Sequence, residues 1–107
     1  MATQGMQDAA AESTRLPAAL PFGLPAASYL GWELGSRVTA EEGVTARQTW
    51  EHRDSGRTLT VYDATEHTVI LGVRTPAGRE RFFGAAAVDL EPRLARLEAA
   101  DDWRRRR

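Results

Sequence analysis

The chain has 107 residues, of which 42% are hydrophobic and 27% charged, and its formal net charge is −1. This balance is typical of one globular domain with a single hydrophobic core. The absence of cysteine excludes disulfide bonds and thiolate metal sites. No run of residues approaches the ~18 apolar residues of a membrane span, and the first residues carry acids where a signal peptide carries bases. We therefore expect a cytoplasmic protein with no membrane contact.

Two segments of different character precede the domain. Residues 1–15 lack hydrophobic periodicity, which predicts a disordered lead. Residues 16–28 repeat Leu-Pro every four residues and form an extended arm, because three prolines exclude a helix. In an extended chain the apolar residues share one side, and they are Leu16, Leu20, Phe22 and Leu24. The arm either covers the core of its own domain or binds a partner protein or second subunit through these four side chains.

Residues 29–103 have the pattern of a single α+β domain. Alternating apolar residues predict five strands joined by short turns, which we expect to pair as an antiparallel β-meander. The strands are expected at residues 30–38, 44–53, 57–62, 67–75 and 79–83. The turns suggest a register in which Trp50 lies opposite both Trp32 and Val61. Val61 then lies opposite Val69 and Leu71 lies opposite Phe83, so that all of them share one apolar face.

A C-terminal helix is predicted to cover this apolar face. Asp89 is a good N-cap residue, and Leu90, Leu94 and Leu97 recur at helical spacing in a segment that extends through Trp103. Residues 104–107 are four arginines that follow the helix as a basic tail. The predicted fold is therefore one five-stranded antiparallel sheet with one helix on its apolar face and the Pro-rich arm.

The other sheet face is the best candidate for function, because it combines arginines with apolar residues. These candidate partner-binding residues are Arg47, Arg53, Tyr62, Ile70, Arg74 and Phe82. Such a composition suits a contact between proteins. The sequence thus favours a small non-enzymatic protein–protein interaction module, expected as a homodimer, that uses this face and the arm.

Nucleic-acid binding is the alternative function. Arginines on an open sheet could hold phosphates, with the tail residues Arg104, Arg105, Arg106 and Arg107 adding charge. Enzyme chemistry has little support, since the chain shows no serine or threonine with an evident base. Asp63, Glu66 and His67 form the one cluster that suggests a metal, and a polar loop explains it better. We expect no metal and no cofactor.

Overall fold

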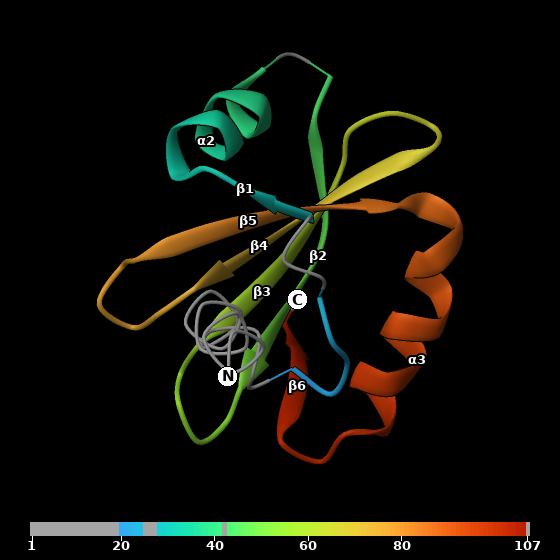
Figure 1. Ribbon diagram of the computed structural model, residues 1–107. Coiled ribbons are helices and arrows are strands. Elements are labelled where there is room, and N and C mark those ends of the chain that lie inside the picture. Colours follow the sequence, from blue (N-terminus) through green and yellow to red (C-terminus); the bar gives the residue numbers. More distant parts are fainter. Residues whose placement is uncertain (1–19, 25–27, 42, 107) are drawn as a thin grey trace, which may run out of the picture.

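The computed structural model describes residues 20–24, 28–41 and 43–106 (Figure 1). The helices are α2 (Trp32–Ala40), the short 3-10 helix η3 (Ala87–Asp89) and α3 (Leu90–Ala99). The strands are β1 (Tyr29–Leu30), β2 (Thr45–His52), β3 (Thr58–Asp63), β4 (Thr68–Arg74), β5 (Glu80–Ala86) and β6 (Trp103–Arg106). In this part of the chain no helix is long and apolar enough to cross a membrane.

The strands form one antiparallel sheet in the order β1-β5-β4-β3-β2-β6. We call the face toward α3 the inner face and the opposite face, on which α2 packs, the outer face (Figure 1). The expected α+β class with an antiparallel sheet is confirmed. The meander from β2 to β5 is also present, and two further strands extend it at its edges.

The register differs from the prediction in two of the three hairpins. Leu71 lies opposite Phe83 as expected. Trp50 lies opposite Leu59 instead of Val61, and Val61 lies opposite Leu71 instead of Val69. Both errors are shifts of two residues. Because side chains alternate between faces with a period of two, such a shift alone changes no face assignment. The alternation is interrupted at a β-bulge of β2 between Ala46 and Gln48.

The predicted first strand is wrong. Only Tyr29 and Leu30 are extended, and they pair with Phe83 and Phe82 of β5. The chain then turns into α2, so Trp32 does not lie opposite Trp50 in the sheet. The alternation of apolar residues in this segment predicted a strand, and the tertiary contact described next overrides that local pattern.

Close packing on Phe82 holds α2 on the outer face. A Cβ atom at Gly35 would collide with the Phe82 side chain, so the helix backbone lies directly against β5. Phe82 and Ile70 are consequently buried, with 2% and 3% of their surface exposed. Trp32 is 55% exposed, because it lies outside this contact.

The core fills the space between the inner sheet face, α3 and the arm. The arm contributes three buried side chains, Leu20, Phe22 and Leu24, so its described part packs on its own chain. The remaining buried members of the core come from β2 to β6 and α3, and they are Trp50, Leu59, Val61, Val69, Leu71, Val73, Phe83, Leu90, Leu97 and Trp103. Leu16 lies outside the described residues.

The C-terminal helix is shorter than predicted. It ends at Ala99, and Ala100 already has an extended backbone. Trp103 is buried at the start of β6, which pairs with β2. Asp89 stands at the N-cap position, although its side chain makes no capping hydrogen bond. The arginines of the expected tail, as far as Arg106, therefore belong to the sheet.

We predict that Gly35→Ala destabilises the protein. Alanine is the better helix former by about 1 kcal/mol, but its methyl group would collide with the Phe82 ring and push α2 off the sheet. Overpacking of this kind costs about 1–3 kcal/mol, which chemical unfolding would measure. Gly23→Ala is the matched control, because a Cβ at Gly23 meets no atom of a described residue within 4 Å. Equal stability of the two variants would contradict this packing.

Candidate functional site

A polar hollow of about 310 Å³ lies on the part of the outer face next to β6. Two rows of cross-strand neighbours build it. In one row Arg106 of β6 lies opposite Thr49, which in turn lies opposite Thr60. In the other row Arg74 lies opposite both Thr58 and Glu80. Tyr62 completes the lining. The sheet thus brings together arginines that are separated by about thirty residues in sequence.

The cations of the hollow are available to a ligand. Arg74 and Arg106 form no salt bridge with any residue of the described chain, and Glu80 is the one carboxylate in the lining. Thr49 and Thr60 share a hydrogen bond between their hydroxyl groups, 3.3 Å apart. Two guanidinium groups with hydroxyl donors beside them suit a carboxylate or another small anionic group.

Tyr62 lies at the boundary between the hollow and the packing of α2. A Cβ at Gly72 would come within 3.2 Å of the Tyr62 ring and 3.3 Å of the Phe82 ring, so glycine leaves room for both rings against β4. Burial raises the pKa of the Tyr62 phenol, and the negative charge of Glu80 raises it further, whereas the hydrogen bond with Thr60 and the charge of Arg74 act in the opposite direction. At neutral pH the phenol is therefore uncharged.

A second, more apolar depression adjoins the first one at Glu80. It is lined by Tyr29, Trp32, Arg79, Glu80 and Arg81. The Arg81 guanidinium lies 6.0 Å from the centre of the Tyr29 ring. Glu80 belongs to the lining of both depressions. An exposed tryptophan therefore stands beside the polar hollow.

The predicted sheet-face residues are divided between different environments. Tyr62 and Arg74 line the hollow. Arg47 sits at a β-bulge of β2 and forms a salt bridge with Asp63, with nitrogen and oxygen 2.7 Å apart. Arg53 is exposed in the turn after β2. Ile70 and Phe82 are buried beside α2, so neither offers surface to a partner.

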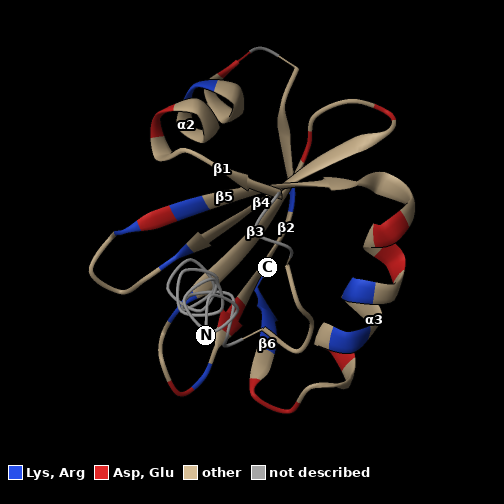
Figure 2. Ribbon diagram, in the orientation of Figure 1, with Lys and Arg blue, Asp and Glu red and all other residues tan. Residues whose placement is uncertain are grey.

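The arginines of the C-terminal strand are exposed on β6. Arg104 lies 3.6 Å from the Glu51 carboxylate across the strand pair, and Figure 2 shows the blue β6 beside the partly red β2. Arg106 lines the hollow. Arg105 lies opposite Trp50 and so points toward the inner face. Arg107 lies outside the described residues.

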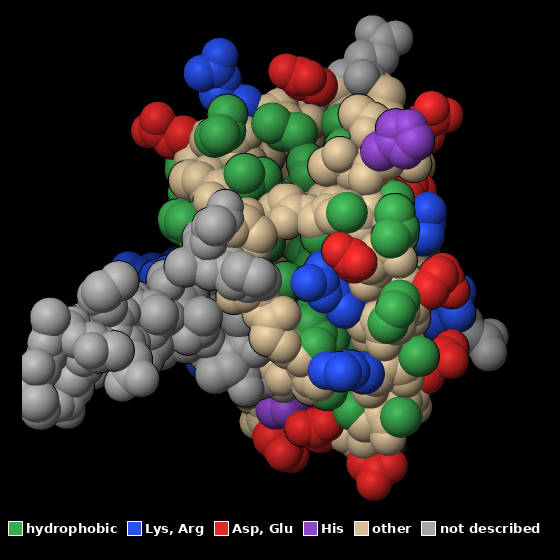
Figure 3. Space-filling model, turned by 45° about the vertical axis from the view of Figure 1, so that its right-hand side comes forward, with side chains coloured by type: hydrophobic (Ala, Val, Ile, Leu, Met, Phe, Trp, Pro, Cys, Tyr) green, Lys and Arg blue, Asp and Glu red, His purple; other side chains and the backbone are tan. Residues whose placement is uncertain are grey.

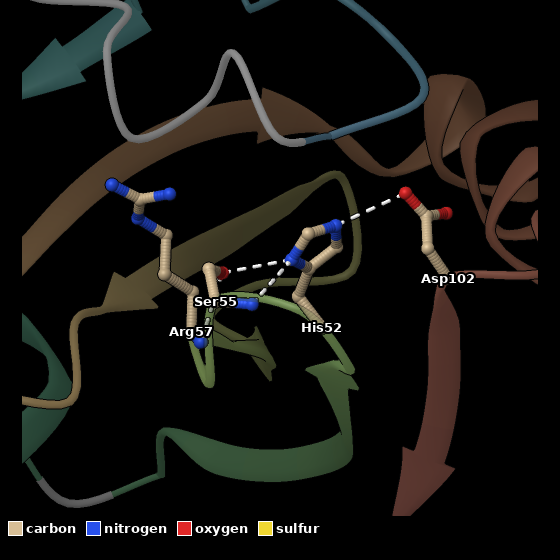
Figure 4. Close-up of polar contacts among 4 residues, drawn as sticks. All are labelled: His52, Ser55, Arg57 and Asp102. Atoms are coloured by element: carbon tan, nitrogen blue, oxygen red, sulfur yellow. Dashed lines mark hydrogen bonds and ion pairs between the residues drawn. The ribbon is translucent and has the colours of Figure 1, made fainter.

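A second cluster joins His52, Ser55 and Asp102 (Figure 4). His52 Nδ1 lies 2.8 Å from the Ser55 hydroxyl oxygen, and Nε2 lies 3.0 Å from an Asp102 carboxylate oxygen. The backbone N–H of Ser55 donates to Nδ1 at 3.2 Å. Nδ1 is therefore the unprotonated nitrogen, and the Nε2–H group donates to Asp102.

This cluster has the residue types of a nucleophilic site, but its geometry is that of a structural brace. The Ser55 hydroxyl accepts a hydrogen bond from the backbone N–H of Arg57 at 3.3 Å. The Arg57 side chain points away from the His52 ring (Figure 4), and its buried Nε has no hydrogen-bond partner among the described residues. None of the surface hollows described here is lined by Ser55. The cluster instead ties the β2–β3 turn to the start of β6.

The predicted loop cluster is dispersed. Asp63 pairs with Arg47, and His67 pairs with Glu66 at 3.2 Å, both of these last side chains being more than four-fifths exposed. Among the described residues no three histidines or acids converge on a point that could hold a metal ion.

The sequence analysis did not identify three residues of the hollows and of the His52 cluster. Trp32 was assigned to the inner face of a strand. Arg106 was assigned to a free tail, because Trp103 followed by a run of arginines shows no alternation that would indicate a strand. Asp102 gave no sequence signal as a partner of His52, fifty residues away. No protein-family model, curated protein sequence or solved structure matches the chain.

We predict that Asp102→Ala lowers the free energy of unfolding by about 1 kcal/mol, because it removes the acceptor of the His52 Nε2–H group. Urea unfolding would measure this loss. Asp101→Ala is the matched control, since the neighbouring Asp101 carboxylate is exposed and makes no side-chain hydrogen bond or ion pair with a described residue. Equal losses in both variants would show that His52 does not brace β6.

We predict that Tyr62 makes the free energy of unfolding depend on pH in the alkaline range. Its pKa is raised in the folded state, so the unfolded chain loses the phenol proton first, which favours unfolding as the pH rises beyond about 10. Below that pH both states keep the proton and the effect vanishes. We expect Tyr62→Phe to weaken the decline of unfolding free energy above pH 10, measured by urea unfolding across that range. An identical decline in both proteins would contradict burial of the phenol.

Proposed function

We propose that the chain is a non-enzymatic protein-binding module that receives an acidic segment of a partner protein on its outer sheet face. The observation that supports this function is the hollow lined by both Arg74 and Arg106, neither of which forms a salt bridge with a described residue. A carboxylate placed between them would accept charge-assisted hydrogen bonds, which are about twice as strong as hydrogen bonds between neutral groups.

The apolar neighbour of the hollow supports a protein partner. Trp32 is exposed beside it and is flanked by Arg79 and Arg81. Tryptophan, tyrosine and arginine are the residues that most often dominate the binding energy of protein interfaces. An anchor for an apolar side chain therefore adjoins a site for an acidic one, and Glu80 belongs to the lining of both.

Nucleic-acid binding has less support from the charges. The chain as a whole carries −1, whereas binding to phosphate backbones rests on a strongly basic surface. Glu80 lies inside the hollow, and Glu51 lies against Arg104. Over α3, Figure 3 shows blue, red and green side chains interleaved, so this helix adds no field of one sign. A carboxylate group needs only the local pair of arginines.

We predict that an acetylated and amidated hexaglutamate peptide binds the outer face. Titration of the isotope-labelled protein should shift the NMR signals of the hollow, and Arg74→Gln/Arg106→Gln should weaken the binding about tenfold or more, because hydrogen bonds to charged groups contribute about 1.5–3 kcal/mol each.

Arg93→Gln/Arg96→Gln is the matched control. It removes the same charge from two arginines that line another hollow, between α3 and the arm. Equal weakening by both double variants would show that net charge alone drives the binding, which would overturn the proposal. Stronger binding of an oligothymidylate than of the peptide would favour nucleic acid. If light scattering shows a dimer and the peptide dissociates it, the outer face binds a second copy of the chain.

A further inference from the structure

Among the described residues, the strand β6 forms one edge of the sheet. In the sheet order it has β2 as its neighbour, and no other strand of the described chain pairs with it. The unpaired N–H and C=O groups along such an edge can bind another extended chain. Proteins use this surface when a peptide of a partner adds a strand to the sheet.

The hydrogen bonds of β2 show which backbone groups of β6 face outward. The N–H of Arg53, directly after β2, donates to the carbonyl oxygen of Asp102 at 2.8 Å. In an antiparallel pair alternate residues bond to the same neighbour, so Glu51 and Thr49 also face β6 and bond to Arg104 and Arg106. The intervening residue, Arg105, therefore directs its N–H and C=O toward the open edge.

The side chains of this edge carry a charge of one sign on both faces. Arg104 and Arg106 lie on the outer face, and Arg106 lines the hollow. Arg105 lies on the inner side. Neither Arg105 nor Arg106 forms a salt bridge with a described residue, and Arg104 has one at 3.6 Å. An occupant of the edge must bring negative charge to within reach of three guanidinium groups.

We propose that the acidic segment of the partner protein binds as an added antiparallel strand on the open edge of β6. This inference rests on the proposed function and specifies the partner as an extended acidic peptide. Its backbone exchanges two hydrogen bonds with Arg105. Its carboxylates lie on the outer face beside Arg104 and Arg106. Of these two arginines, Arg106 also lines the hollow.

A second copy of the chain is a poor occupant of the same edge. Antiparallel pairing of two β6 strands would set arginines opposite arginines, and like charges directly opposite one another are destabilising. Charged side chains on edge strands commonly prevent association between copies in this way. The same charges attract an acidic strand, so they select one class of occupant against the other.

Alternating peptides of threonine and glutamate test the backbone contact directly. With the glutamates beside Arg104 and Arg106, the threonines lie on the face of Arg105, and their N–H groups point at β6. Methylation of the threonine amide nitrogens should weaken binding about fivefold, because it removes the donor to the Arg105 carbonyl, which is worth about 1 kcal/mol. Methylation of the glutamate nitrogens should leave the affinity nearly unchanged, since those groups face away. Equal affinities of the two methylated peptides would overturn the added strand.

Two variants at one position provide the same test from the protein side. Arg105→Pro removes the outward N–H but breaks no hydrogen bond between β6 and β2. Edge strands tolerate proline at positions of this kind. Arg105→Gln keeps this N–H and removes only the charge. We expect the proline variant to bind the unmethylated peptide much more weakly than the glutamine variant does. Equal binding by the two variants would contradict the proposal.

The outcomes separate this inference from the proposed function. One outcome is that the peptide binds, that Arg74→Gln/Arg106→Gln weakens the binding, and that the two methylated peptides have equal affinities. The hollow then binds acidic segments without an added strand. If the double variant binds as the wild type does, the proposed function fails, whatever the methylated peptides show. Self-association that Arg105→Pro abolishes would assign the edge to a second copy and would overturn the inference.

Discussion

The contact between Gly35 and Phe82 divides the outer sheet face into two parts. Because α2 lies directly on the Phe82 ring, the apolar residues of β4 and β5 become a second small packing layer. No described element covers the threonines and arginines nearer to β6. A sheet with one solvent-exposed face would have spread these residues over a flat surface. The helix instead bounds the exposed part on one side, which makes a hollow of it.

The other boundary of the hollow is β6, and its position depends on Trp103. The buried indole anchors the strand in the core, and the His52 ring packs on it with ring centres 5.0 Å apart. His52 also bonds to Asp102, so the start of β6 is fixed by an apolar contact and a polar one. This arrangement places Arg106 on the outer face.

The sequence predicted the parts of the fold in which local patterns and the global structure agree. Alternation along β2 to β5 assigned Leu59, Val61 and Phe83 to the inner face, and errors of two residues in register did not alter that assignment. The leucine spacing likewise located α3. The alternation of Trp32 and Leu34 wrongly predicted a strand. The segment is a helix that packs through Gly35 on Phe82, and no local sequence pattern indicates that contact.

The candidate site was only partly predictable for the same reason. Tyr62 and Arg74 could be assigned to the outer face from alternation alone. Their separation from Ile70 and Phe82, which are equally outer residues by that pattern, required knowledge of where α2 packs. The return of the chain to pair Arg106 with Thr49 is a contact across 57 residues, and a four-residue strand gives too short a pattern to announce it.

The measurement that tests this account most directly is a nuclear Overhauser spectrum of the isotope-labelled full chain. The account predicts cross-peaks between the α protons of Gly35 and the ring protons of Phe82, since the helix backbone and the ring are in contact. Their absence from a well-resolved spectrum of the folded protein would contradict the account, because the outer face would then be open across all of its strands and the hollow would lose its boundary.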